Sequence, residues 1–173
     1  MAARRAARNS GAERDGVQNE LSGPNEDRKK TISLPSTMDS VAELESMAEK
    51  LATDAGLDED ETFRVSMAAR EAAVNAVLHG NEYDSAKHVT ASFENTGESI
   101  RITIADEGRD FDPSKLPDPR EPENLLLGTG RGIFLIRSMM DEVNFRQLHP
   151  GTELTLVKHL ARSGENETAL AGE

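Results

Sequence analysis

Cysteine and tryptophan are absent from the 173-residue sequence, which also contains only five Phe and one Tyr. The lack of cysteine excludes a disulfide scaffold, a thiolate zinc site and a cysteine nucleophile. The scarcity of aromatic side chains argues against a surface on which nucleic-acid bases stack. No apolar run approaches the roughly 18–20 residues that a transmembrane helix needs. We therefore expect no membrane segment and a cytoplasmic location.

Positive charge is also in short supply, because 20 Lys and Arg stand against 32 Asp and Glu, a formal net charge of −12. This balance argues against direct contact with nucleic acid, which requires clustered basic residues. Residues 1–30 contain few large aliphatic side chains. Such a segment buries too little apolar surface to offset its ordering entropy, so we predict a disordered tail over 1–30 and a flexible tail over 162–173. The predicted folded domain is 31–161.

Hydrophobic periodicity divides this domain into three helices and five strands. The turn sequences predict two antiparallel hairpins, and the whole predicts an α+β fold, an α/β sandwich with helices covering one face of a mostly antiparallel sheet. Gly56 is expected to end the first helix and Asp58 to cap the second. The predicted elements are a strand at 31–34, helices at 37–55 and 58–79, strands at 87–95 and 99–106, a helix at 130–140, and strands at 142–148 and 153–160.

The first candidate motif is Glu71-Ala-Ala-Val-Asn75-Ala-Val-Leu-His79-Gly80-Asn81, of which Gly80-Asn81 is expected to end the helix. Glu71 and Asn75 are four residues apart and therefore share one helix face. An Asn oxygen suits Mg²⁺, which takes few protein ligands beside substrate phosphates, and a carboxylate one turn away can accept a proton from an attacking hydroxyl. Such a pair is more often simply a solvated helix face. The apolar residues around it instead indicate a largely buried helix, on which polar groups need partners.

Two further motifs follow along the chain. The first, Asp106-Glu107-Gly108-Arg109-Asp110-Phe111, ends a predicted strand, where an Asp can accept a hydrogen bond from an exocyclic amine such as that of adenine. The second, Gly128-Thr129-Gly130-Arg131-Gly132-Ile133, opens a predicted helix, whose free N–H groups suit phosphates. Each is weak alone, since an Asp-Gly turn and a flexible helix start are common. Between them lies a proline-rich connection at 107–127, of a length typical of a functional lid or a disordered segment.

Taken in order, the three motifs and a terminal Gly151-Thr152 pair resemble the nucleotide site of the Bergerat-type ATPases, the superfamily of histidine kinases, gyrase B and MutL. Residues 71–79 resemble their N box, 106–111 their G1 box and 128–132 their G2 box. The short chain and the compact lid are most similar to the stand-alone anti-sigma-factor serine kinases of the RsbW type. The resemblance covers about 130 residues, essentially the whole predicted domain.

The resemblance implies a Bergerat-type ATP-binding fold with an ATP lid, ATP and Mg²⁺ as cofactors, and a role for each motif residue. Asn75 would hold Mg²⁺ and Glu71 would be the catalytic base. Asp106 would read the adenine amino group beside Gly108, with help from Thr152. The phosphates would be bound by Gly128, Thr129, Gly130, Arg131 and Gly132. Asp110 departs from the family, which often has a second glycine there, and this leaves kinase activity and the lid geometry open.

The leading hypothesis from the sequence is a serine/threonine protein kinase that acts as an anti-sigma regulatory factor. The resemblance implies that it phosphorylates an anti-anti-sigma partner and sequesters a sigma factor, and it suggests a homodimer. The alternative is a non-catalytic, ATP-gated protein-binding module of the same fold, which would keep the pocket without phosphoryl transfer. The two hypotheses differ in what they require of Glu71.

Overall fold

The computed structural model describes residues 28–109 and 131–161. The predicted tails and most of the predicted lid, including Asp110, Gly128, Thr129 and Gly130, lie outside the described residues. Within the described ranges no helix is both long and apolar enough to cross a membrane.

The described elements are five strands, three α-helices and one π-helical segment. The strands are β1 (Lys29–Pro35), β2 (His88–Asn95), β3 (Ser99–Ala105), β4 (Glu142–Gln147) and β5 (Thr152–His159). The α-helices are α1 (Met38–Asp54), α2 (Glu59–Val74) and α3 (Arg131–Met139), and a π-helix at Asn75–Gly80 continues directly from α2.

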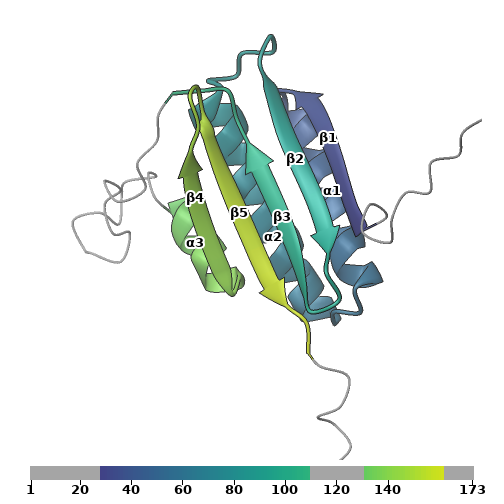
Figure 1. Ribbon diagram of the computed structural model, residues 1–173. Helices are drawn as coiled ribbons and strands as arrows, with labels where there is room; N and C mark the ends of the chain where they lie inside the picture. Colours follow the sequence, from purple (N-terminus) through teal and green to yellow (C-terminus); the bar gives the residue numbers. More distant parts are fainter. Residues whose placement is uncertain (1–27, 110–130, 162–173) are drawn as a thin grey trace, which may run out of the picture.

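The strands form one sheet in the order β1-β2-β3-β5-β4, and every neighbouring pair is antiparallel. The helices lie together behind this sheet and leave its other face uncovered by described elements (Figure 1). The predicted α+β sandwich is thus confirmed, including both hairpins. The first strand differs from the prediction, because β1 begins at Lys29 and includes Pro35. A proline is tolerated there because β1 is an edge strand.

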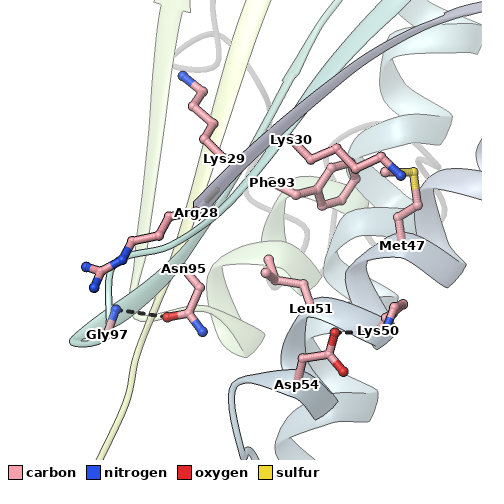
Figure 2. A pocket seen from close by; sticks show the side chains of 10 residues that line it. All are labelled: Arg28, Lys29, Lys30, Met47, Lys50, Leu51, Asp54, Phe93, Asn95 and Gly97. Carbon is pink, nitrogen blue, oxygen red and sulfur yellow. Dashed lines mark hydrogen bonds and ion pairs between the residues drawn. The ribbon is translucent and has the colours of Figure 1, made fainter. Parts of the chain in front are cut away.

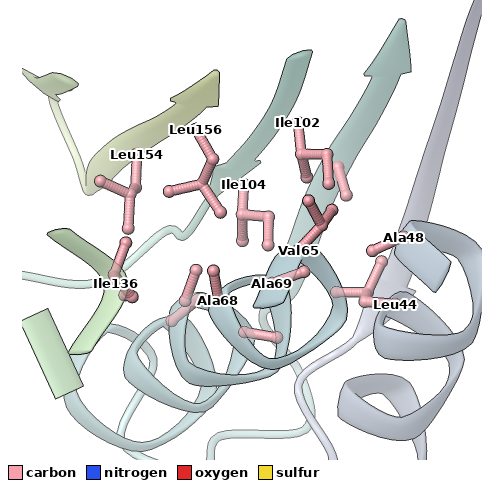
Figure 3. Packing of buried hydrophobic residues seen from close by; sticks show 14 of the residues in the cluster. Leu44, Ala48, Val65, Ala68, Ala69, Ile102, Ile104, Ile136, Leu154 and Leu156 are labelled. Atoms are coloured by element: carbon pink, nitrogen blue, oxygen red, sulfur yellow. The ribbon is translucent and has the colours of Figure 1, made fainter. Parts of the chain in front are cut away.

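The core lies between the sheet and the helices, as the alternation in β3 illustrates. Ile100, Ile102 and Ile104 are buried, whereas Arg101 between them points to the uncovered face and is exposed. Facing them, α2 presents a row of alanines whose small side chains let the helix lie close to the strands (Figure 3). Leu156 of β5 and Leu44 of α1 extend the same layer.

Both predicted helix boundaries between α1 and α2 are confirmed. Gly56 has a φ of +82° and directly follows the last turn of α1, where the N–H of Leu57 donates to the carbonyl of Ala52 over 3.1 Å. This is the Schellman arrangement, which favours glycine because L side chains rarely adopt that conformation. The carboxylate of Asp58 accepts from the N–H of Glu61 at 2.8 Å, which caps α2.

The position of Ile102 gives a test of this core. Ile102→Ala is expected to lower the free energy of unfolding by about 2–5 kcal/mol, because the fully buried side chain leaves a cavity. Arg101→Ala, on the opposite face of the same strand, is expected to change it by no more than about 0.5 kcal/mol. Urea unfolding measures both. Equal losses in the two variants would contradict the assignment of the faces.

Candidate functional site

The first side of the site is a helix that changes its winding at Asn75. The structure places Asn75 at the junction where α2 ends and the π-helix Asn75–Gly80 begins. The backbone N–H of Asn81 closes the widened turn by donating to the carbonyl of Ala76 over 2.8 Å. The predicted single helix over 58–79 is therefore wrong in its last turn. Short π-helical turns frequently occur at functional sites, and periodicity does not reveal them.

Glu71 and Asn75 face the start of α3, which packs against α2. A Cβ built on Gly132 would lie 3.0 Å from Oε2 of Glu71 and 3.5 Å from Oδ1 of Asn75. The structure thus brings residues of the first and third motifs together. Because Gly132 has no side chain, the start of α3 can lie close to Glu71 and Asn75. A larger residue at this position would displace the carboxylate of Glu71 or the amide of Asn75.

Two buried polar atoms at the site have no hydrogen-bond partner among the described residues, Nδ2 of Asn75 and Oγ1 of Thr152. Leaving such a group unpaired costs about 1–3 kcal/mol. A bound ligand that supplies the missing partners would remove this cost. A half-turn of the Asn75 amide exchanges its nitrogen and oxygen, so the same position can offer either a donor or an oxygen ligand.

The second side of the site is the carboxylate of Asp106, which directly follows β3 and is 9% exposed. Its Oδ1 accepts from the N–H of Gly108 at 2.9 Å and from the N–H of Thr152 at 3.3 Å. Its backbone N–H donates to the carbonyl of Thr152 over 3.0 Å. Within the described part of the chain nothing donates to Oδ2, so this oxygen is left for a ligand.

Burial raises the pKa of Asp106 above its ordinary value of 3.8, because desolvation disfavours the charged form. The backbone hydrogen bonds from Gly108 and Thr152, and the positive charge of Lys87, oppose this rise in pKa. A carboxylate with these partners is a strong acceptor for a neutral N–H donor once it is ionised.

Three glycines surround Asp106 where the backbone leaves no room for a side chain. A Cβ on Gly80 would overlap the Asp106 carboxylate, one on Gly108 would overlap the carbonyl of Gly80, and one on Gly151 would overlap the carbonyl of Asp106. Gly80 ends the π-helix that begins at Asn75, so these contacts join the two sides of the site.

Asn81 is the last residue of the first motif, but the sequence assigned its side chain no role in the site, and the structure shows that this side chain connects three segments. It is fully buried; its Nδ2 donates to the carbonyl of His88 over 2.9 Å, and its Oδ1 accepts from the N–H of Glu107 at 2.9 Å. The carboxylate of Glu107 in turn accepts from the N–H of His88 at 2.7 Å. Asn81 thus ties the end of the π-helix to the start of β2 and to the turn after β3.

The two residues that follow Asn81 have an unusual backbone conformation. Glu82 and Tyr83 both have positive φ values, 55° and 60°. Two successive residues of this kind cost roughly 1–2 kcal/mol each. The hydrogen bonds of the buried Asn81 side chain offset this cost, and an ion pair of 3.3 Å between Glu82 and Arg109 links the loop to the turn after Asp106. The sequence does not predict these positive φ values, because neither position is a glycine.

The remaining predicted site residues contribute less to the described geometry. Arg131 is exposed at the first position of α3. Gly128, Thr129 and Gly130 lie outside the described residues. Among the described residues no group of three or more His, Cys, Asp or Glu side chains could hold a metal ion. A metal at this site would therefore rely on Asn75, water and a ligand, which is the usual pattern for Mg²⁺ beside phosphates.

Comparisons with known proteins identify relatives of this chain. A relative named anti-sigma F factor, from Anoxybacillus flavithermus, is 31% identical over 109 residues, which is 60% of this chain and 73% of that protein. A relative named serine-protein kinase RsbW, from Staphylococcus aureus, is 33% identical over 115 residues, 62% of this chain and 72% of that protein.

A crystal structure of the RsbU and RsbW domains of a Mycobacterium tuberculosis protein has the same fold, with a TM-score of 0.54 and 20% identity. The match covers 78% of this chain and 33% of that one. The family model described as histidine kinase-like ATPase domain matches residues 34–158. This range includes Glu71, Asn75 and Asp106, together with the glycines around Asp106, which are Gly80, Gly108 and Gly151. The chain therefore belongs to the histidine kinase-like ATPase domain family.

Proposed function

We propose that this protein is an ATP-dependent serine/threonine protein kinase and an anti-sigma regulatory factor. In this proposal it phosphorylates an anti-anti-sigma partner and sequesters a sigma factor, in the cytoplasm and as a possible homodimer. The names of the relatives support the regulatory role. The observation that carries the nucleotide site is the buried carboxylate of Asp106, with one oxygen unpaired by described residues, beside the helical segment of Glu71 and Asn75.

Adenine would be recognised by a donor–acceptor match at Asp106. The unpaired Oδ2 accepts a hydrogen bond from the exocyclic amine, while Oδ1 stays bonded to Gly108 and Thr152. Guanine carries an oxygen at the corresponding position, so two acceptors would face each other. The buried hydroxyl of Thr152 supplies a further hydrogen bond to the base.

The triphosphate would lie between Asn75 and the N-terminal end of α3. Mg²⁺, when bound, neutralises phosphate charge, and the oxygen of Asn75 is its protein ligand in this proposal. The free N–H groups at the start of α3, together with Gly128, Thr129 and Gly130, suit the phosphates. Gly132 lets this end of α3 come close to Asn75. Arg131, exposed at the first position of α3, adds positive charge there.

Glu71 is proposed as the catalytic base. A serine hydroxyl of the partner protein attacks the γ-phosphorus in line, and its proton passes to the carboxylate of Glu71 as the bond to the ADP leaving group breaks. Glu71 lies one turn before Asn75 on the same helix face, which supports a base close to the phosphates that Asn75 and Mg²⁺ would hold in this proposal.

Glu71→Gln tests the base. The variant is expected to lose phosphoryl transfer to a co-purified partner roughly 10²- to 10⁴-fold, because general base catalysis is worth that much. ATP affinity is expected to stay within about threefold, since the base is not used in binding. Glu59→Gln, in the exposed first turn of the same helix, is the matched control. Full transfer activity in Glu71→Gln would show that a different group is the base, whereas absence of transfer by the unmodified protein would favour the non-catalytic, ATP-gated alternative.

Asp106→Asn tests the adenine contact and its pH dependence. The amide presents a donor to the adenine amine, so affinity for ATP is expected to fall roughly 10- to 100-fold.

In the unmodified protein the raised pKa of Asp106 makes the free energy of unfolding fall as pH rises from about 3.8 through the pKa of the folded state, because the native state holds the proton to higher pH than the unfolded state does. ATP affinity is expected to rise over that same window. Calorimetry and thermal unfolding across pH measure both, and unchanged affinity in Asp106→Asn would contradict the assignment.

Asn81→Ala tests the positioning residue. Removal of this buried side chain unpairs the carbonyl of His88 and the N–H of Glu107, so we expect a loss of stability of about 1–3 kcal/mol together with weaker ATP binding. Ser36→Ala is the matched control, because Ser36 is equally buried and its hydroxyl has no partner among described residues. Normal ATP affinity in a folded Asn81→Ala variant would show that Asn81 stabilises the fold alone.

A further inference from the structure

A pocket in the surface lies away from the site described above. It is a pocket of about 530 Å³ between the start of β1, the end of β2 and the second half of α1 (Figure 2), here called the β1–α1 pocket. Its defining residues are the basic Arg28, Lys30 and Lys50 and the apolar Met47, Leu51 and Phe93.

The β1–α1 pocket is independent of the nucleotide site. It lies beside the turn between β2 and β3, where Gly97 contributes to its rim, whereas Asp106 follows the other end of β3. The seven residue steps from Ser99 to Asp106 span about 23 Å of extended chain. A ligand in one site therefore does not touch the other.

The rim of the pocket carries more positive than negative charge, because its lining residues include Arg28, Lys29, Lys30 and Lys50 but a single carboxylate, that of Asp54. Lys50 pairs with Asp54 at 2.8 Å, an exposed pair of low energetic value. Arg28 donates only to a backbone carbonyl, that of Thr96, and Lys30 has no carboxylate partner within residues 28–109 and 131–161. In a protein with a net charge of −12, such a cluster is a place where the electrostatic energy of an approaching anion is lower than over the rest of the surface.

The floor of the pocket is apolar. Phe93 is 4% exposed, and Met47 and Leu51 are half-buried. Lys30 and Met47 both line the pocket, so charged and apolar side chains share its wall (Figure 2). An occupant that matches this surface combines an apolar side chain with carboxylates placed around it.

The edge of β1 supplies the third element of the surface. In the described sheet β1 has a neighbour on one side only, so its other edge can accept an added strand. Lysines on an edge strand repel a second copy of the same edge. A segment with negative charge meets no such repulsion, so the edge selects by charge.

We propose that the β1–α1 pocket and the adjoining edge of β1 bind an extended acidic segment of a partner protein. One aliphatic or aromatic side chain of this segment fills the pocket over Phe93, and its carboxylates pair with Arg28, Lys30 and Lys50. A nucleic acid fits less well, because the floor holds no exposed aromatic ring for base stacking and the cations are few.

The test starts from a random displayed peptide library selected against the full chain, which identifies the preferred peptide chemistry without assuming a partner. The enriched peptides are expected to be acidic, with an aliphatic or aromatic residue between the carboxylates. A fluorescein-labelled copy of the most enriched peptide then serves as the probe in anisotropy titrations. Lys30→Glu is expected to weaken binding of the peptide by about tenfold or more. The control is Arg64→Glu, an equal change of charge at an exposed position of α2, which is expected to weaken binding by less than about twofold.

Backbone NMR shifts locate the bound probe, and they are expected at the amides of Lys30, Leu51 and Asn95. Enrichment of neutral or basic peptides would overturn the proposal, as would acidic peptides that bind Lys30→Glu unchanged or shift amides elsewhere. Displacement of the probe by an equal concentration of a single-stranded thymidine oligonucleotide would assign the surface to nucleic acid instead.

The chain's own acidic C-terminal residues are the remaining alternative occupant. The N–H of Leu160 donates to the carbonyl of Glu98 over 2.8 Å, so the chain passes beside the pocket before residue 162. Glu165→Lys with Glu167→Lys in the full chain, without any peptide, is expected to leave the amides of Lys30 and Leu51 in place. Shifts at those amides would show that the pocket holds this chain's own C-terminal segment, and the proposal of a partner protein would be wrong.

Discussion

The carboxylate of Asp106 lies where three backbone segments approach more closely than any side chain would allow. Gly80, Gly108 and Gly151 come from the end of the π-helix, the turn after β3 and the turn before β5, and a Cβ on any of them would overlap a neighbour. Because these segments are far apart in the sequence, their meeting fixes where α2 ends relative to the sheet. That constraint also buries Asp106, raises its pKa and leaves its Oδ2 without a protein donor in the described chain.

The rest of the fold supports this junction and supplies the second half of the site. The alanine row of α2 lets that helix lie close to Ile102 and Ile104, so the helix that carries Glu71 and Asn75 ends beside the last residues of β3. The π-helical turn and the buried amide of Asn81 then bring Gly80 against Asp106. Stability and binding are coupled here, since the polar atoms left unpaired at Asn75 and Thr152 cost free energy that a nucleotide would recover.

Periodicity and turn chemistry were enough to predict the sheet, both hairpins and the caps at Gly56 and Asp58, because these depend on local sequence. The motifs also named Glu71, Asn75, Asp106 and Gly132, and the structure brings Gly132 to within side-chain contact of Glu71 and Asn75. The π-helix, the role of Asn81 and the left-handed pair Glu82–Tyr83 were not predictable, because each depends on contacts with β2 and the turn after β3. The β1–α1 pocket was missed for the same reason, since Lys30, Lys50 and Phe93 meet only in the folded chain.

The central claim is that Asp106 selects an adenine nucleotide by accepting a hydrogen bond from its exocyclic amine. Isothermal titration calorimetry of the full chain with ATP and with GTP, each in the presence of Mg²⁺, tests this claim most directly. We expect one ATP site per chain and an affinity for GTP lower by roughly 100-fold or more, because the guanine oxygen would face the buried carboxylate. Equal affinities for ATP and GTP, or no binding of ATP, would contradict it.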